Sequence, residues 1–167
     1  SVAFLIHKDK WIFGERAKKI GINKAKQFIF DTKMMLGKNF HDQEINKHWP
    51  FEITNDQNNI KIMIKIDNEI QKFYPYEIAG LILKDLLLIS QVNGISSISR
   101  IIISAPIQYN EIQINDLKKA AELAEFQNFN IYSDPILASL AYLYCMKEDI
   151  KYFQNIFILF VHVFSYV

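Results

Sequence analysis

Apolar and amphipathic runs alternate along the second half of this chain, and that alternation limits the fold more than any other feature. Three short apolar runs predict strands, and the two amphipathic runs between them predict helices. Asn110 is placed to cap the first helix, and Pro135 opens the second. A sheet flanked by helices buries such a pattern, so the sequence predicts an α/β fold. The expected strands are residues 100–104, 130–132 and 155–159.

The first half of the chain combines strand patterns with two helix signals. Residues 60–66 place isoleucine at every second position, with Lys61, Met63 and Lys65 between, so one face of this strand should be buried and the other wet. A short helix is predicted from Gly14 to Gly21. The other expected strands are residues 2–6, 11–13, 51–54 and 70–73.

A long helix is predicted from Pro75 to about Gln91, because proline is well suited to the first helical turn. Its apolar stripe is wider than one ordinary helix face, so the helix either packs on nearly all sides within an intact domain or needs a partner surface, and we expect the first. The expected core positions are Ile78, Leu81, Ile82, Leu86 and Ile89, with Leu83, Leu87 and Leu88 widening the stripe.

The charge composition of this chain does not point to any class of binding partner. The 167 residues include 19 basic and 18 acidic residues, a formal charge of +1, and half are hydrophobic. Such a balance is typical of a globular protein and gives no indication of nucleic-acid binding or attraction to an anionic membrane. The apolar run at residues 152–167 is shorter than the roughly 20 residues that cross a bilayer, so no membrane span is predicted.

Cysteine and histidine do not indicate a reactive or metal-binding centre. The single cysteine, Cys145, lies in an apolar helical context and is interpreted as a buried, inert thiol. The four histidines lack the spacing of metal ligands, so no metal site is predicted. They are His7, His41, His48 and His162.

One motif has a residue order that an amphipathic segment does not explain. Residues 30–40 read FDTKMMLGKNF, and residues 48–51 read HWPF. Asp31 is predicted to cap a short helix that carries Lys33, and Gly37 to end it. By itself Lys33 would be a solvated lysine. The two runs, however, resemble the ATPase domain of the Hsp70 chaperone family, in which Phe-Asp-x-Lys-x-x-x-Gly precedes His-Trp-Pro-Phe.

The resemblance continues through residues 73–78, which read FYPYEI, through the strand that ends at Pro106, and through Asp134 at the start of a helix. The spacing agrees over about residues 1–159. The implied fold is a partial lobe I of an actin-like ATPase, which has a ribonuclease H-like sheet and a small inserted α+β subdomain. On this resemblance residues 1–167 form a partial nucleotide-binding domain, with the insertion at about 14–95, the main subdomain at 96–159 and a departure from the family at 160–167.

The resemblance also implies roles for three residues. Lys33 corresponds to the lysine that reaches the ATP phosphates, which makes it a catalytic and cofactor-binding residue. Asp134 corresponds to an acidic residue that positions magnesium-bound water, and it also suits a helix N-cap. Pro106 corresponds to a proline in the relay between the ATPase and substrate domains. The arginine with which this proline communicates in the family is replaced here by Asn130, so the resemblance does not extend to the whole relay.

The two phosphate loops of the family are not matched. One, a Gly-Thr-Thr turn, would precede Ser1. The other is an Asp-Leu-Gly-Gly-Gly-Thr run whose aspartate falls on Phe160 and whose glycines fall on His162, Val163 and Phe164. Glycine permits positive φ and close approach of the backbone to phosphate, and these side chains do not. The family binds ATP with Mg²⁺, but we do not expect this chain alone to hydrolyse ATP.

Three hypotheses about function follow from these matches and gaps. In the first, the chain is a fragment of an Hsp70-type, ATP-dependent protein-folding chaperone. In the second it is a degenerate, non-catalytic binding module of the family, and in the third a non-functional remnant. The family implies unfolded client proteins, J-domain co-chaperones and nucleotide exchange factors as partners. The sequence itself carries no signal for a compartment, and a cytoplasmic location is the expectation.

Overall fold

The computed structural model of this chain describes residues 2–7, 10–21, 25–66, 69–95 and 98–146. It shows the expected mixture of strands and helices. The elements in chain order are β1 (Val2–His7), β2 (Lys10–Phe13), α1 (Gly14–Gly21), β3 (Phe28–Phe30), α2 (Thr32–Met35), β4 (Glu52–Asp56), β5 (Asn59–Ile66), β6 (Glu69–Phe73), α3 (Pro75–Val92), β7 (Ile101–Ala105), α4 (Glu111–Leu123), β8 (Phe129–Ser133) and α5 (Asp134–Met146), with short 3-10 turns at Ala25–Gln27 and Phe40–Asp42.

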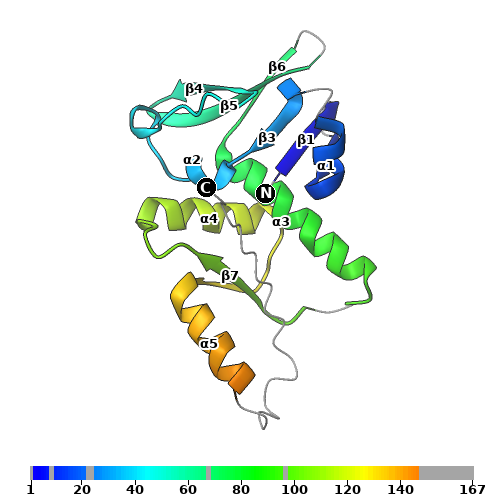
Figure 1. The fold of residues 1–167 in the computed structure, drawn as a ribbon, viewed down its shortest axis with the longest axis vertical. Helices are drawn as coiled ribbons and strands as arrows, with labels where there is room; N and C mark the ends of the chain where they lie inside the picture. The colour runs from blue at the N-terminus through cyan, green and yellow to red at the C-terminus, as the bar shows by residue number, and fades with distance from the viewer. Residues whose placement is uncertain (1, 8–9, 22–24, 67–68, 96–97, 147–167) are drawn as a thin grey trace.

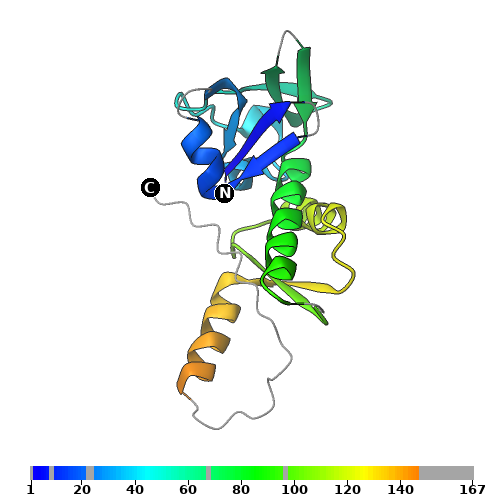
Figure 2. The same cartoon turned by 90° about the vertical axis from the view of Figure 1, so that its right-hand side faces the viewer.

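Helix α3 connects the two halves of the molecule. Two antiparallel three-stranded sheets, in the orders β2-β1-β3 and β4-β5-β6, lie around its first turns. The parallel pair β7-β8 lies toward its other end, with α4 beside it and α5 beyond (Figures 1 and 2). We call the first half the sheet region, residues 2–73, and the second half the β7–β8 region, residues 98–146.

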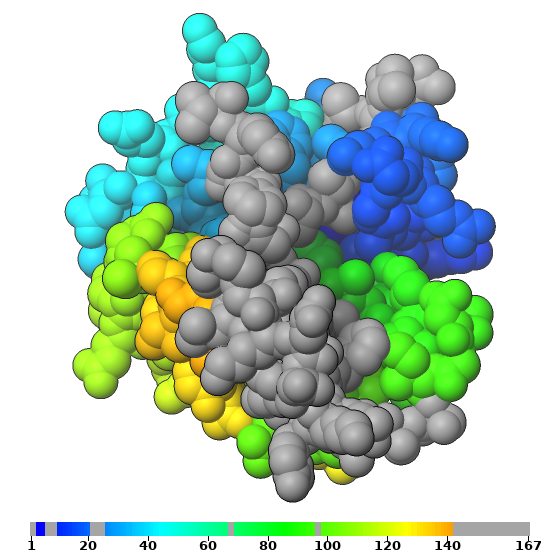
Figure 3. Space-filling view, turned by 60° about the horizontal axis from the view of Figure 1, so that its bottom comes forward, coloured from blue at the N-terminus to red at the C-terminus, as the bar shows by residue number. Residues whose placement is uncertain are grey.

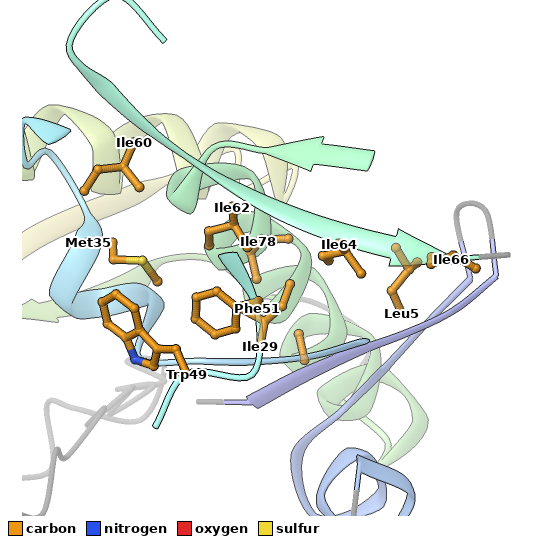
Figure 4. Close-up of a cluster of buried hydrophobic side chains, with 11 residues drawn as sticks. Leu5, Ile29, Met35, Trp49, Phe51, Ile60, Ile62, Ile64, Ile66 and Ile78 are labelled. Atoms are coloured by element: carbon orange, nitrogen blue, oxygen red, sulfur yellow. The ribbon is translucent and has the colours of Figure 1, made fainter. Parts of the chain in front are cut away.

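The alternation in β5 is confirmed and builds the core of the sheet region. Ile60, Ile62, Ile64 and Ile66 are all buried, while the residues between them are half-buried or exposed. Figure 4 shows these isoleucines facing Phe51, Trp49 and Ile78, the last contributed by α3. β4 and β5 are closer to one another in sequence than predicted, because only Gln57 and Asn58 form the turn, both at positive φ.

Small side chains bring α4 against α3 in the β7–β8 region. Ala120, Ala121 and Ala124 at the end of α4 are completely buried, and a Cβ atom on Gly80 of α3 would lie 2.9 Å from Leu123 Cβ. The predicted cap of α4 is confirmed, since Asn110 Oδ1 accepts a hydrogen bond from the Gln113 amide at 2.9 Å. Strands β7 and β8 pair in parallel from Ile101 with Phe129 to Ala105 with Ser133.

The wide apolar stripe of α3 is explained by two separate cores. Ile78 is buried in the core of the sheet region, whereas Leu83 is buried in that of the β7–β8 region. The prediction that Ile89 is a core residue was wrong, because its side chain is 49% exposed. Leu88, one of the residues that widen the stripe, is also 51% exposed. The helix therefore turns different faces toward two cores as it passes between them.

Among the described elements, helix α5 packs mainly on β7 and β8. Leu137 is buried, but Ile136 is 51% and Leu140 54% exposed. The space-filling view shows α5, in orange, as part of the outer surface (Figure 3). The predicted strand at residues 155–159, the side chain of Cys145 and the run at 160–167 lie outside the described residues.

Candidate functional site

Helix α2 holds Lys33 against the body of the protein. Thr32 and Met35 of this four-residue helix are buried, which leaves Lys33 half-buried beside them. Asp31 occupies the N-cap position of α2, as predicted, but its side chain makes no capping hydrogen bond. Asp31 has a left-handed backbone, with φ of 60°, and its Oδ2 instead accepts a hydrogen bond from Trp49 Nε1 at 3.1 Å.

This hydrogen bond joins the two runs of the sequence motif, residues 30–40 and 48–51. The HWPF run supplies an indole that fixes the residue immediately before α2, and the stacked rings of Trp49 and Phe51 anchor it in the core. Gly37 follows the helix at φ of 60°, as its predicted role as helix end requires. A Cβ atom there would lie 2.6 Å from the backbone of Gln113, so only glycine fits against α4.

Two of the predicted site residues lie on one small cavity between α2, α3 and the end of β7. Its volume is about 50 Å³, and its lining is mostly apolar. Lys33 contributes from α2, and Pro106 contributes from the turn after β7. The other lining residues are Thr32, Leu36, Ala79, Ile82, Leu83, Ile103, Ser104, Tyr109 and Leu117.

Asp134, the third predicted residue, is joined to this cavity through Ser104. The Ser104 hydroxyl donates a hydrogen bond to Asp134 Oδ1 from the neighbouring strand. Burial lowers the pKa of the Lys33 ammonium, and the negative charge of Asp134 opposes that shift. The structure therefore brings Lys33, Asp134 and Pro106 into one neighbourhood, although they are about 30 to 100 residues apart in sequence.

Tyr109 is a residue of this site that the sequence reasoning missed. Its backbone N–H donates to the Pro106 carbonyl at 3.0 Å, which closes the turn after β7. Its hydroxyl donates to the Lys33 carbonyl oxygen at 2.8 Å. Burial, and then the charge of Asp134, raise the pKa of the Tyr109 phenol, so it remains a donor. Tyr109 is thus a direct connection between the Pro106 turn and the helix of Lys33.

These groups fit one phosphate group better than a complete nucleotide. The ammonium of Lys33 can pair with phosphate oxygens, and the oxygen atoms of Ser104 and Asp134 are of the kind that Mg²⁺ binds. Ligand pockets for small molecules usually exceed about 300 Å³, well above the volume of this cavity. Among the residues that the structure describes, no group of three or more His, Cys, Asp or Glu could hold a metal ion.

The chain matches the family described as Hsp70 protein over residues 1–161. It belongs to the Hsp70 family. A heat shock protein of Pyricularia oryzae is 26% identical over 137 residues, which cover 80% of this chain and 22% of that protein. A ribosome-associated molecular chaperone of Saccharomyces cerevisiae is 25% identical over 134 residues, covering 78% and 22%. The heat shock 70 kDa protein of Ajellomyces capsulatus is 27% identical over 142 residues, covering 83% and 20%.

This Hsp70-family chain spans about a fifth of the length of the curated relatives that it matches. The resemblance on the motif around Lys33 is therefore confirmed at the level of the family, as is the mixed α/β fold of a partial ATPase domain. In the part of the chain that is described, no helix is both long and apolar enough to cross a membrane.

Proposed function

We propose that this chain forms part of the ATP-binding domain of an Hsp70-type chaperone that assists protein folding in an ATP-dependent cycle. The observation that supports the proposal most is that Lys33 and Pro106 line one cavity and that Asp134 is hydrogen-bonded to Ser104, which also lines it. Membership of the family supports it independently. The division into an inserted subdomain at about residues 14–95 and a main subdomain at 96–159 is part of the same proposal.

In this proposal the chain supplies one side of a phosphate site. Lys33 directs its ammonium toward the phosphate oxygens, and the Tyr109 hydroxyl holds the backbone of α2 so that the ammonium keeps its place. The charge of Asp134 opposes the lowering of the Lys33 pKa by burial, and the hydrogen bond with Ser104 ties Asp134 to β7. Bound Mg²⁺–ATP would supply the phosphoryl group, and the protein would supply positioning and charge.

The cavity also offers a way to pass a signal from nucleotide to the rest of the chaperone. Pro106 and Lys33 are connected by two hydrogen bonds, both made by Tyr109. A shift of Lys33 toward phosphate would therefore pull on the turn after β7. We infer that Pro106 acts in the interdomain relay through this link, and that the partners of the parent protein are unfolded client proteins, J-domain co-chaperones and nucleotide exchange factors in the cytoplasm.

We do not expect ATP hydrolysis by this chain alone. Phosphoryl transfer depends on charged and hydrogen-bonding groups placed around the whole triphosphate, and the described residues of this site supply one ammonium and one carboxylate. The positions that correspond to the glycine loop, 162–164, lie outside the described residues. The same small, apolar cavity favours the second candidate, a family member that binds without catalysis.

Nucleotide binding can be tested with isotope-labelled protein and Mg²⁺–ATP by NMR spectroscopy. Amide shifts are expected at residues 32–36, 104–109 and 134, with a dissociation constant no tighter than about 1 mM, because few charged hydrogen bonds are available. Lys33→Met should remove the saturable shifts. Lys118→Met, which removes an exposed lysine from α4, is the matched control. Saturation that is unchanged in Lys33→Met would exclude Lys33 as a phosphate ligand.

A further inference from the structure

A second, more polar cavity lies between the end of α2 and α4. It is formed by the loop after α2, the start of β5, the first turn of α3 and the exposed side of α4, and its volume is about 250 Å³. We call it the α2–α4 cavity. Lys33, Pro106 and Asp134 do not line it. It therefore has no part in the site described above.

Its walls are held in place by contacts between distant elements. The Gly37 amide donates to Asp116 Oδ2 of α4 at 3.1 Å, and a Cβ atom on Gly37 would overlap the backbone of Gln113. On the other wall the rings of Tyr74 and Tyr76 stack with centroids 5.2 Å apart. Lys119 Nζ lies 5.1 Å from the centroid of the Tyr76 ring. These contacts preform the cavity, so a ligand would not have to order it.

The acidic group in this cavity is already neutralised. Lys119 Nζ lies 2.9 Å from Asp116 Oδ1, while the Gly37 amide occupies the other carboxylate oxygen. The Asp116 carboxylate, bonded to Lys119, raises the pKa of that ammonium, so the pair persists at neutral pH. Lys38 is then the uncompensated charge among the lining residues, and the cavity carries a net positive charge.

Three hydrogen-bond donors on the cavity have no partner among the residues that the structure describes. They are the ammonium of Lys38, the hydroxyl of Tyr76 and the side-chain amide of Asn115. Burial is the main cause that raises the pKa of the Tyr76 phenol, so its proton stays available for donation. Donors of three chemical types and one net positive charge on a preformed polar cavity suit an oxyanion.

We propose that the α2–α4 cavity binds a small oxyanion, with Lys38 as its charged ligand and Tyr76 and Asn115 as neutral donors. Its volume accommodates a phosphate or carboxylate group and is smaller than the usual pocket for a nucleotide-sized ligand. Both head groups have the required acceptor oxygens, carried by a free anion or by a small metabolite. The proposal does not depend on nucleotide binding at Lys33.

The test is a titration of the complete chain with inorganic phosphate and, separately, with acetate, at constant ionic strength. Amide signals of Gly37 and the side-chain NH₂ of Asn115 report on the cavity. Saturable shifts are expected, and the anion that binds more tightly identifies the head group. Lys38→Met should weaken binding about tenfold, as loss of a charged hydrogen bond does, and Tyr76→Phe severalfold.

Two controls separate this site from its surroundings. Lys118→Met removes an exposed lysine of α4 outside the cavity and should leave the affinity unchanged. Lys33→Met should also leave the anion affinity unchanged. This control separates the anion site from the proposed nucleotide site, so failure of one proposal can be told from failure of the other. Thermal unfolding confirms that each variant is folded. Linear, non-saturating shifts with both anions, or equal affinity in Lys38→Met and the unaltered chain, would overturn the proposal.

Discussion

The sheet region and the β7–β8 region bury their apolar surface in different ways. The core of the sheet region is built from large side chains, including Phe51 and Trp49, between two sheets and the first turns of α3. The core of the β7–β8 region combines the buried alanines of α4 with larger side chains such as Ile103, Leu117 and Phe126, and Gly80 lets α3 approach α4 closely. Other large apolar side chains of this region lie on the surface, as Ile136 and Leu140 of α5 do.

This difference indicates which region completes its own core. In the sheet region the inward-facing isoleucines of β5 are buried in one cluster of large side chains. In the β7–β8 region the helices approach one another closely, yet the outer faces of α5 and of the end of α3 stay open. We infer that the sheet region is the more stable of the two against local unfolding, since stability is not uniform within a domain.

The largest expected effect is from a cavity in the core of the sheet region. Ile62→Ala should lower the free energy of unfolding by about 3 kcal/mol, because the Ile62 side chain is fully buried and its removal leaves a void. Ile136→Ala, the same substitution on the half-exposed face of α5, should cost less than about 0.5 kcal/mol. Urea unfolding measures both, and equal costs would show that the two regions are covered equally well.

Close packing between α3 and α4 gives the next effect. Gly80→Ala should destabilise the protein by about 1 to 2 kcal/mol, although alanine favours helix, because its Cβ would lie 2.9 Å from Leu123 Cβ and 3.0 Å from the Ala120 carbonyl oxygen. Gln91→Ala, at an exposed position of the same helix, is the control and should be nearly neutral. Stabilisation by Gly80→Ala would mean that the helices have room to separate.

The link between the two regions at Tyr109 should have a smaller, local effect. Tyr109→Phe removes the hydrogen bond to the Lys33 carbonyl and should cost about 1 kcal/mol. Hydrogen exchange should accelerate in α2 more than in β5. Tyr132→Phe, which alters an exposed phenol on β8, serves as the comparison. Unchanged protection of α2 in Tyr109→Phe would show that this helix is held by Trp49 and the core alone.

The smallest effect concerns the charge of Lys33. Its pKa should lie below the usual value of about 10.4, since burial disfavours the ammonium, and Asp134→Asn should lower it further by removing the opposing charge. The unfolded chain then binds more protons between the folded pKa and about 10.4, so stability should rise with pH across that window. NMR titration of ¹³C-labelled lysine measures the pKa directly. A value at or above the usual one would contradict burial as the dominant cause.

Local sequence patterns were sufficient for most of the elements and for several of their ends. The alternation of β5, the proline at the start of α3 and the asparagine cap of α4 were all predicted, because each is fixed by residues within a few positions of one another. Strand β3 was missed, since its three residues are too short for a periodic pattern and its pairing with β1 is a tertiary contact. The motif around Lys33 identified the family without any knowledge of the fold.

The sequence by itself determined the α/β class, most helix and strand positions and the candidate residues Lys33, Asp134 and Pro106. Only the tertiary structure decided that Asp31 bonds to Trp49, that Leu83 and not Ile89 is buried, and that Tyr109 joins the Pro106 turn to α2. The physical reason is separation along the chain. A helix cap or an alternating strand depends on residues that are close in sequence. Burial and hydrogen bonds between distant segments depend on how the two cores pack against α3.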